Sequence, residues 1–322
     1  MSFLQTITPI NLLEEKEKFL SDTSYNPQFK YSEPIDQKKL YKFGQPQKKY
    51  LELAQKIVDE AYHNRNEQDL VMMKGPVQTQ AQVTKKIKSF LKMHHLEKRY
   101  EIVWSSSFIS RVTITSKTIK LKSIAEFRKD DTIGMLYHEI GTHALRRLNY
   151  EKQPWYKKKK KNGLTTNYLR TEEGLAALHS LIPLQYKSAY ATALRYLAVD
   201  ISQQKSFSEL WKFLTRYVDN IETRWMICVR QKRGIENTSK SGGYTKDLVY
   251  FEGMVEVCKW LSENNFDPTQ LYFGKIATQD TEKTVTLNPS FKPILPSFYM
   301  LSPEEYQNNL LKIGKLNDFN KT

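Results

Sequence analysis

Residues 137–143 read Tyr-His-Glu-Ile-Gly-Thr-His, and residues 171–176 read Thr-Glu-Glu-Gly-Leu-Ala. Two histidines, an adjacent carboxylate and a later carboxylate can supply the ligands of a metal ion and a base for its water. The His-Glu-x-x-His pattern of zinc hydrolases places its histidines four positions apart, on one face of an α-helix. Here His138 and His143 are five positions apart, roughly 140° around an ideal α-helix. The spacing therefore predicts a π-bulge with an i to i+5 hydrogen bond, and we expect Gly141 to lower its steric cost.

The two segments supply a complete set of candidate residues for a zinc-dependent hydrolase. We expect His138, His143 and Glu173 to bind one zinc ion, because three protein ligands leave the fourth position open, as in catalytic sites. Glu139 is the expected general base, since a carboxylate beside the attacking water can take its proton. The sequence Glu-Gly-Leu-Ala after Glu172 resembles the Glu-Gly-Phe-Ala of aminopeptidases, in which the glutamate before the glycine binds zinc. We therefore favour Glu173 over Glu172 as the third ligand.

A structural explanation competes with the metal site. Either segment alone would be explained more simply by polar residues on a helix surface or by a hydrogen-bonded core histidine. Their conjunction in one apolar helical context favours a metal site. We expect His63, His94 and His95 to be structural, and also His179, although its position six residues past Glu173 makes it a candidate for a contact behind the ligands.

Composition limits the classes of protein to which the chain can belong. With 322 residues, the chain can bury a cleft without disulfides. Cys228 and Cys258 lack the spacing of a metal-binding pair, so we expect reduced, buried thiols. Residues 1–20 lack the pattern of a signal peptide, and no run is long and apolar enough to span a membrane. We therefore expect a cytoplasmic protein with no membrane partner.

The chain carries a strong positive charge. Its 50 Lys and Arg residues against 35 Asp and Glu residues give a formal net charge of +15. This imbalance predicts an acidic partner. Nucleic acid is an unlikely one, because no nucleic-acid-binding signature accompanies the charge. Lys157–Lys161 are five consecutive lysines, a run typical of a solvated loop or an import signal, and they lie between the two halves of the candidate site.

Hydrophobic periodicity predicts an α+β fold that is predominantly α. Besides the helix with the histidines, helices are expected over residues 12–20, 48–62, 80–91, 209–230, 245–263 and 303–313, and from about residue 171. We expect N-caps at Asp130–Thr132, Thr171 and Thr245. Residues 100–104 and 111–121 alternate β-branched or aromatic residues with polar ones, which predicts a small sheet with a turn at Ser116-Lys117. Residues 1–45 are expected to form an arm packed on a single catalytic domain over residues 46–322.

Residues that could hold a substrate are harder to find than metal ligands. Lys246 and Tyr250 are four positions apart on a predicted helix, where the lysine could bind a carboxylate and the tyrosine could donate to an oxyanion. Arg111, Arg146 and Arg170 lie near the predicted sheet and the metal segments, and we consider them for carboxylate recognition. An exposed lysine and a core tyrosine are the competing interpretation.

Taken together, these segments resemble the tubulin tyrosine carboxypeptidases, the microtubule-associated type with a His-Glu-x-x-x-His site. The resemblance covers about residues 10–275. Besides the two metal segments, it is carried by Asn26-Pro27-Gln28-Phe29, Ile109-Ser110-Arg111-Val112, Leu145-Arg146, Asn149, Gln153-Pro154-Trp155, Thr245-Lys246-Asp247 and Tyr250. The five-lysine run and the C-terminal region depart from the family's pattern.

The resemblance implies a zinc metallopeptidase of zincin-like architecture, with a small sheet next to the active-site helix. It implies removal of the C-terminal tyrosine, or another aromatic residue, from the acidic tail of α-tubulin. His138, His143 and Glu173 would bind the zinc and Glu139 would be catalytic. The positive charge would then attract the acidic tail, at microtubules in the cytoplasm. The alternatives are a zinc peptidase acting on another protein or peptide and a basic microtubule- or nucleic-acid-binding protein without catalysis.

Overall fold

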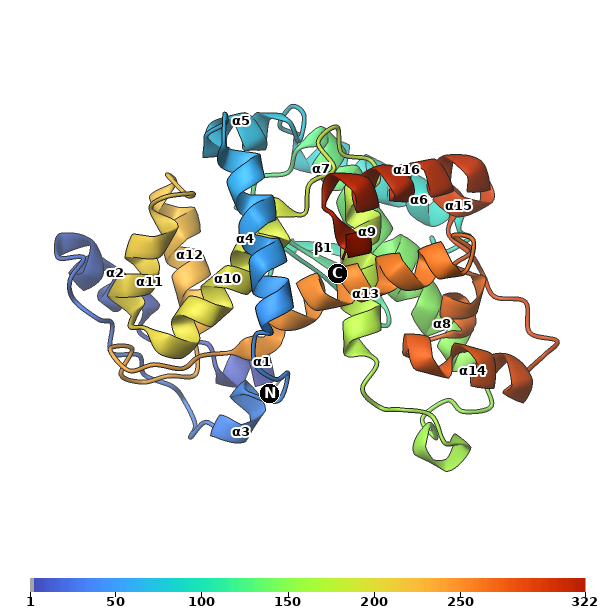
Figure 1. Ribbon diagram of the computed structural model, residues 1–322, viewed down its shortest axis with the longest axis horizontal. Coiled ribbons are helices and arrows are strands. Elements are labelled where there is room, and N and C mark those ends of the chain that lie inside the picture. Colours follow the sequence, from blue (N-terminus) through green and yellow to red (C-terminus); the bar gives the residue numbers. More distant parts are fainter. Residues whose placement is uncertain (1–2, 322) are drawn as a thin grey trace. The chain divides into compact units, whose positions relative to one another are not determined.

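A computed structural model describes residues 3–321, which form two compact units (Figure 1). The first unit contains residues 3–70 and 189–251, and the second contains residues 71–188 and 252–321. Helix α13 (Leu248–Glu263) begins in the first unit and ends in the second. Within residues 3–321, every helix is too short or too polar to span a lipid bilayer. Our division into an arm over residues 1–45 and one catalytic domain over residues 46–322 stays a prediction.

The first unit is helical. Its elements are α1 (Phe3–Thr6), α2 (Leu12–Ser21), α3 (Gln37–Leu40), α4 (Lys48–Tyr62), the start of α5 (Glu67–Met72), α10 (Tyr190–Gln204), α11 (Phe207–Leu214), α12 (Ile221–Lys232) and the 3-10 helix η3 (Thr245–Asp247). Helix α4 packs along α10, where the Tyr50 and Tyr196 rings lie 6.3 Å apart. Phe19 of α2 packs edge-on against Phe207 and Trp211 of α11, with ring centroids 5.0 Å apart in both pairs. These buried aromatic rings join the N-terminal helices to the rest of the unit.

The second unit combines a small sheet with helices. Its elements are α6 (Gln80–Met93), β1 (Glu101–Ser105), β2 (Val112–Ile114), β3 (Thr118–Lys122), α7 (Lys129–Leu136), the π-helix η1 (Tyr137–Ala144), α8 (Leu145–Glu151), α9 (Leu169–Leu181), α14 (Thr281–Leu287), α15 (Ser297–Met300), α16 (Pro303–Leu316) and the 3-10 helices η2 (Lys160–Asn162), η4 (Thr269–Phe273), η5 (Thr278–Asp280) and η6 (Phe319–Lys321). Helices and a small sheet confirm the predicted α+β class with a predominance of helix.

The sheet has the strand order β1-β3-β2. Strand β3 pairs in parallel with β1, placing Ile119 beside Ile102, and antiparallel with β2, placing Lys120 beside Thr113. The Ile119 and Leu121 side chains of β3 are buried, as expected for the apolar face of alternating strands. Strand β2 lies beside η1, so the sheet adjoins the segment that carries both histidines.

Two glycines allow α9 and α13 to cross closely within the second unit. A Cβ atom on Gly174 would lie 2.1 Å from the carbonyl carbon of Gly253, and one on Gly253 would lie 2.0 Å from the carbonyl oxygen of Arg170. The Arg170 guanidinium pairs with Glu252 at 2.6 Å and with Glu256 at 2.9 Å across the same crossing. The glycine of the Glu-Glu-Gly motif is therefore required by packing, because a side chain there would force the helices apart.

The predicted N-caps of α7 and α9 are wrong. Helix α7 follows Arg128, and the Thr132 hydroxyl donates to the Arg128 carbonyl at 2.6 Å without capping the helix. Helix α9 begins at Leu169, so Thr171 lies inside it, and its hydroxyl accepts a hydrogen bond from the Thr278 amide at 3.1 Å. Thr132 thus bonds back to the residue before its own helix, and Thr171 bonds to a distant part of the chain, so neither side chain caps a helix.

Two predicted helices in the later sequence also need correction. Residues 209–230 form parts of two helices, because Asn220 caps α12 by accepting from the Thr223 amide at 2.8 Å. The predicted helix from residue 245 starts as the 3-10 helix η3. Thr245 does not cap it, since its hydroxyl donates to the Leu40 carbonyl at 3.0 Å. At Asn220 a local cap interrupts a continuous apolar stripe, and at Thr245 a tertiary hydrogen bond takes up the side chain that was expected to cap the helix.

The two cysteines are as predicted. Cys228 and Cys258 are both free and buried. Burial raises the pKa of the Cys258 thiol to about 12 and that of Cys228 well above its ordinary value. Neither thiol therefore has the reactivity of a nucleophile or a metal ligand.

Candidate metal centre

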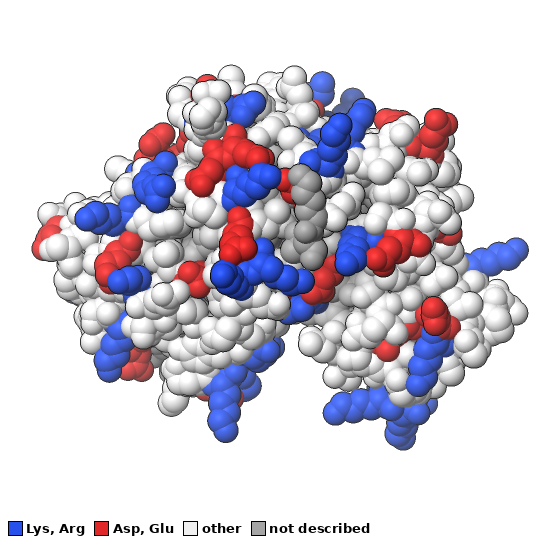
Figure 2. Space-filling model, in the orientation of Figure 1, with Lys and Arg blue, Asp and Glu red and all other residues white. Residues whose placement is uncertain are grey.

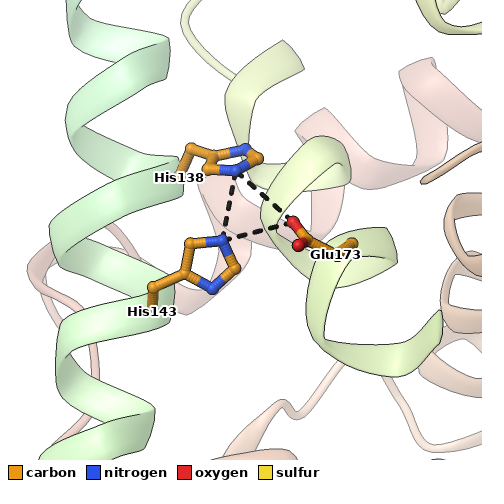
Figure 3. Close-up of side chains that lie close together, drawn as sticks. All are labelled: His138, His143 and Glu173. Atoms are coloured by element: carbon orange, nitrogen blue, oxygen red, sulfur yellow. Dashed lines mark hydrogen bonds and ion pairs between the residues drawn. The ribbon is translucent and has the colours of Figure 1, made fainter. Parts of the chain in front are cut away.

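The helix that carries the histidines departs from α geometry where the spacing predicts it. Residues 137–144 form the π-helix η1 between α7 and α8. The Thr142 hydroxyl donates to the carbonyl of Tyr137, five positions earlier, at 2.9 Å. Both imidazoles consequently leave the same side of the helix and point toward Glu173 on α9 (Figure 3). The prediction of a π-bulge between His138 and His143 is confirmed.

Gly141 has a role that the sequence did not predict. Its φ angle is not in the left-handed region, so backbone freedom is not the reason for glycine here. A Cβ atom at this position would lie 2.6 Å from Cε1 of Phe298, whose ring stacks on Tyr137 with centroids 4.1 Å apart. The Gly141 carbonyl also accepts a hydrogen bond from the Tyr272 hydroxyl at 2.6 Å. Glycine is needed because aromatic residues from the C-terminal part of the second unit pack directly on η1.

The three predicted ligands converge. Among residues 3–321, His138, His143 and Glu173 form a group whose ligand atoms all lie within 4.8 Å of one another. The Nε2 atoms of the two histidines are 3.2 Å apart, and Oε2 of Glu173 lies 3.4 Å from Nε2 of His143 and 3.9 Å from Nε2 of His138. Tetrahedral zinc with bonds of about 2.0–2.2 Å needs ligand atoms about 3.3–3.6 Å apart, close to the three observed distances. The donor set therefore fits a zinc ion.

Glu172 occupies a different position from Glu173. Its buried carboxylate contacts Nδ1 of His143 at 2.8 Å and accepts from Arg146 Nη1 at 2.6 Å and from Lys275 Nζ at 2.7 Å. Burial raises the pKa of this carboxyl, but the charges of Lys275 and Arg146 outweigh it and hold the pKa well below its usual range. An anionic Glu172 accepts the Nδ1 proton of His143, which leaves the Nε2 lone pair for a metal. The geometry therefore favours Glu173 as the third ligand.

Arg146 serves the interior of the protein. Its guanidinium is fully buried and, besides Glu172, donates to the backbone carbonyls of Leu271, Gly274 and Ile276 at 2.8–3.0 Å. Arg146 has no exposed surface with which to bind a substrate. The prediction that it could recognise a substrate carboxylate is therefore wrong.

The electrostatics of the histidine pair are asymmetric. Burial lowers the pKa of His143, but hydrogen bonds to Glu172 and Glu173 outweigh this effect and raise the pKa to about 9. Burial and the neighbouring charge of His143 lower the pKa of His138 to about 3. Two imidazoles in contact are rarely both positively charged, because the two charges repel each other. A cation between them would replace that proton.

Glu139 lies on η1, next to His138 in the sequence. The pKa of its carboxyl is raised above the ordinary value, mainly by burial and also by the nearby Glu173. The neighbouring His143, the backbone of Ile114 in β2 and the charge of Arg111 lower the pKa, but they do not outweigh burial. A raised pKa suits a carboxylate that must accept and return a proton. Arg111 itself forms an ion pair with Asp131 and remains partly exposed.

The other predicted substrate residues lie on separate elements. Arg170 is half-buried on α9 and pairs with Glu252 and Glu256 as described above. Lys246 and Tyr250 belong to the first unit, where the Lys246 ammonium lies 5.6 Å from the Tyr250 ring centroid. The part of Arg111, Arg170, Lys246 and Tyr250 in substrate binding stays a prediction.

The remaining histidines lie apart from the three ligands. His179 is buried, with Nδ1 2.8 Å from the Thr142 hydroxyl and Nε2 2.8 Å from the Tyr306 hydroxyl. It thus braces η1 from behind, as its position suggested. His94 is half-buried beside the Ser297 hydroxyl, and His63 and His95 are exposed.

Sequence reasoning missed Lys275, Tyr272, Phe298 and Tyr306. All four act on η1 or α9 from more than 90 residues away in the chain. No motif surrounds them, and their residue types alone carry no signal of this role. Only the folded chain could have identified them.

The chain is similar in sequence to a family of known proteins over most of its length. A family model described as microtubule-associated tyrosine carboxypeptidase matches residues 18–290. The chain belongs to this family. The matched residues include both segments of the candidate metal centre, and the resemblance to the microtubule-associated tyrosine carboxypeptidases is confirmed.

Individual members of the microtubule-associated tyrosine carboxypeptidase family are similar over most of the chain. The human microtubule-associated tyrosine carboxypeptidase 1 is 30% identical over 289 residues, which are 87% of this chain and 60% of that protein. The mouse and rat proteins of the same name are 28% and 29% identical over 98% of this chain and 68% of their own length. The chain therefore spans 60–68% of the length of these relatives.

Proposed function

We propose that the protein is a zinc-dependent carboxypeptidase of zincin-like architecture that removes the C-terminal tyrosine, or another aromatic residue, from the acidic tail of α-tubulin. The observation that carries the proposal is the convergence of His138, His143 and Glu173 across η1 and α9, with Glu139 on the same π-helix. Family membership supports the reaction class, because the relatives' name describes tyrosine carboxypeptidases. The same name supports a place at microtubules in the cytoplasm.

The ligands, Glu139 and Glu172 would have different roles in the reaction. When bound by the three ligands, zinc supplies Lewis acidity to the scissile carbonyl and to the attacking water. The Glu139 carboxylate takes the proton of that water and returns it to the amino group of the departing residue. Glu172 keeps the proton of His143 on Nδ1, so that Nε2 stays available as a ligand.

Substrate binding would use the charge of the protein. The tail of α-tubulin is acidic, and the net charge of +15 would raise the rate at which the protein meets it. We propose Arg111, Arg170, Lys246 and Tyr250 as contacts for the substrate. The proposal for Arg111 is supported by its charge, which acts on the Glu139 carboxyl.

The test compares the unmodified protein with Glu139→Gln on purified tubulin. Loss of the C-terminal tyrosine is followed with an antibody that requires this residue, and zinc content is measured in both proteins. We expect Glu139→Gln to keep its zinc and to lose at least about 100-fold in rate, the usual contribution of a general base. An unmodified protein without stoichiometric zinc, or a variant as fast as the unmodified protein, would rule the proposal out.

A further inference from the structure

The five consecutive lysines differ in their exposure to solvent. Lys159 is buried, with 7% of its surface exposed, whereas Lys157, Lys158, Lys160 and Lys161 are exposed. We call these four exposed residues and their backbone the basic loop. No Asp or Glu occurs between Glu151 and Glu172. The loop is the yellow-green segment at the lower right of Figure 1, and Lys and Arg side chains gather at this end of the second unit in Figure 2.

Lys159 anchors the basic loop to the second unit. Its ammonium group donates to the Lys275 carbonyl. It also lies 3.4 Å from the ring centroid of Tyr168 and 5.1 Å from that of Tyr150. Carbonyl and aromatic groups solvate an ammonium ion without neutralising its charge. The central lysine therefore fixes the loop and leaves the positive charge of its neighbours uncompensated.

Apolar packing holds the base of the basic loop. Trp155 before the loop and Leu164 after it are buried together with Phe273 and Ile276. Gly163 has a φ angle of 65°, which lets the chain turn back directly after the lysines. The loop is thus pre-ordered, and a ligand would not have to supply the free energy of ordering its backbone.

The anchor of the basic loop also supports the metal centre. The Lys275 carbonyl accepts from Lys159, and the Lys275 ammonium donates to Glu172, which holds Nδ1 of His143. These groups all belong to the second unit, so the loop has a defined position relative to the ligands. The four exposed lysines have no carboxylate partner among the ion pairs of residues 3–321, and their charge is available to a ligand.

We propose that the basic loop is a docking surface for an acidic polypeptide strand, which it holds while the end of that strand reaches the metal centre. This inference rests on the proposed function and adds to it the residues that select a carboxylate-rich substrate. Ammonium groups on a short, fixed loop match a flexible strand of Glu and Asp side chains in charge. Such an interaction weakens as salt increases.

The test uses two variants with the same change in charge. In the loop variant, Lys157, Lys158, Lys160 and Lys161 are all replaced by Gln. In the control variant, Gln replaces the exposed Lys85, Lys88, Lys92 and Lys117 of the same unit. Each protein is titrated with a fluorescent oligoglutamate peptide ending in tyrosine at several salt concentrations. Hydrolysis of this peptide and of a short neutral peptide ending in tyrosine is then measured.

We expect the loop variant to bind the acidic peptide at least about tenfold more weakly at low salt, the lower range for electrostatic steering. Its KM for the acidic peptide should rise with kcat unchanged, and its hydrolysis of the neutral peptide should equal that of the unmodified protein. In the control variant, binding of the acidic peptide should weaken by less than about half of the factor measured for the loop variant. Equal losses in the two variants would show that net charge alone acts and would overturn the proposal, as would unchanged binding by the loop variant.

Two further readouts separate the alternatives. Duplex DNA that displaces the acidic peptide at a lower concentration than unlabelled peptide does would overturn the proposal in favour of nucleic acid. If the unmodified protein hydrolyses neither peptide, the proposed function fails. The binding titrations still decide whether the basic loop holds an acidic strand.

Discussion

Replacing Glu172 with glutamine tests how the interior of the protein supports the metal centre. Glu172 is not one of the three proposed ligands, yet its carboxylate contacts His143, Arg146 and Lys275 at 2.6–2.8 Å. Glu172→Gln keeps the shape of the side chain and removes its charge. The amide can no longer balance two cations, and it accepts the Nδ1 proton of His143 more weakly.

The expected cost follows from the burial of these groups. Removing one partner of a buried ion pair typically costs about 3–5 kcal/mol. Arg146 would keep its three carbonyl acceptors and Lys275 is partly exposed, so we expect about 3 kcal/mol less stability in the metal-free protein. Loss of a carboxylate behind a ligating histidine typically weakens metal binding by about 10–100-fold. Zinc affinity should therefore fall by about this factor.

Two measurements check this prediction. Zinc affinity is obtained by competition with a chelator, and the free energy of unfolding by urea titration of the metal-free protein. Glu139→Gln is the matched control, since it makes the same chemical change on η1 and should leave zinc affinity within about threefold. If Glu172→Gln bound zinc as tightly as the control, its support of His143 would be refuted. If Glu172→Gln abolished binding and Glu173→Gln did not, the assignment of the third ligand would be reversed.

Three other predictions follow from the packing and charge of named residues. Gly141→Ala should destabilise the protein by about 1–3 kcal/mol, because its new Cβ meets the Phe298 ring, and Phe298→Leu in the same chain should recover part of this loss in urea unfolding. Burial raises the pKa of Asp247, but Arg230 at 2.6 Å outweighs it and holds the pKa well below its usual range. Asp247→Asn should therefore lower the free energy of unfolding at pH 7 by at most about 3–5 kcal/mol. The loss should be smaller than this limit because Arg230 is partly exposed, and solvent screens its interaction with Asp247. The stability from this carboxylate is complete above the unfolded pKa of about 3.9, so the difference between the proteins should shrink as pH falls below about 4; a constant difference would contradict the assignment. Lys232→Met should cost about 1–3 kcal/mol or more, measured by thermal unfolding, because the buried ammonium shares its three N–H donors among four backbone carbonyls that would lose their partner.

The sequence predicted the candidate metal centre because ligand chemistry and helix geometry are both local. The spacing of His138 and His143 required a widened helix, and η1 is one. The types of residue in Thr-Glu-Glu-Gly-Leu-Ala offered a candidate carboxylate ligand, and Glu173 lies within reach of both histidines. The small sheet and most helices followed from hydrophobic periodicity, since each pattern reports which face of one element is buried.

Helix ends were predicted less well, because a capping residue has alternatives that lie far away in the chain. Thr171 and Thr245 have side chains suited to N-caps, but their hydroxyls bond to the Thr278 amide and the Leu40 carbonyl. Tertiary partners thus decided what local propensity left open.

The sequence by itself determined which atoms can bind a metal and that the helix between the histidines must be distorted. Only the tertiary structure decided that Glu173 faces the Nε2 atoms of both histidines whereas Glu172 contacts Nδ1 of His143, and why position 141 has no side chain. It also decided that Lys159 is an anchor, whereas its neighbours are exposed. Each of these outcomes depends on a residue more than 20 positions away, and burial and hydrogen bonding between distant segments exist only after the chain has folded.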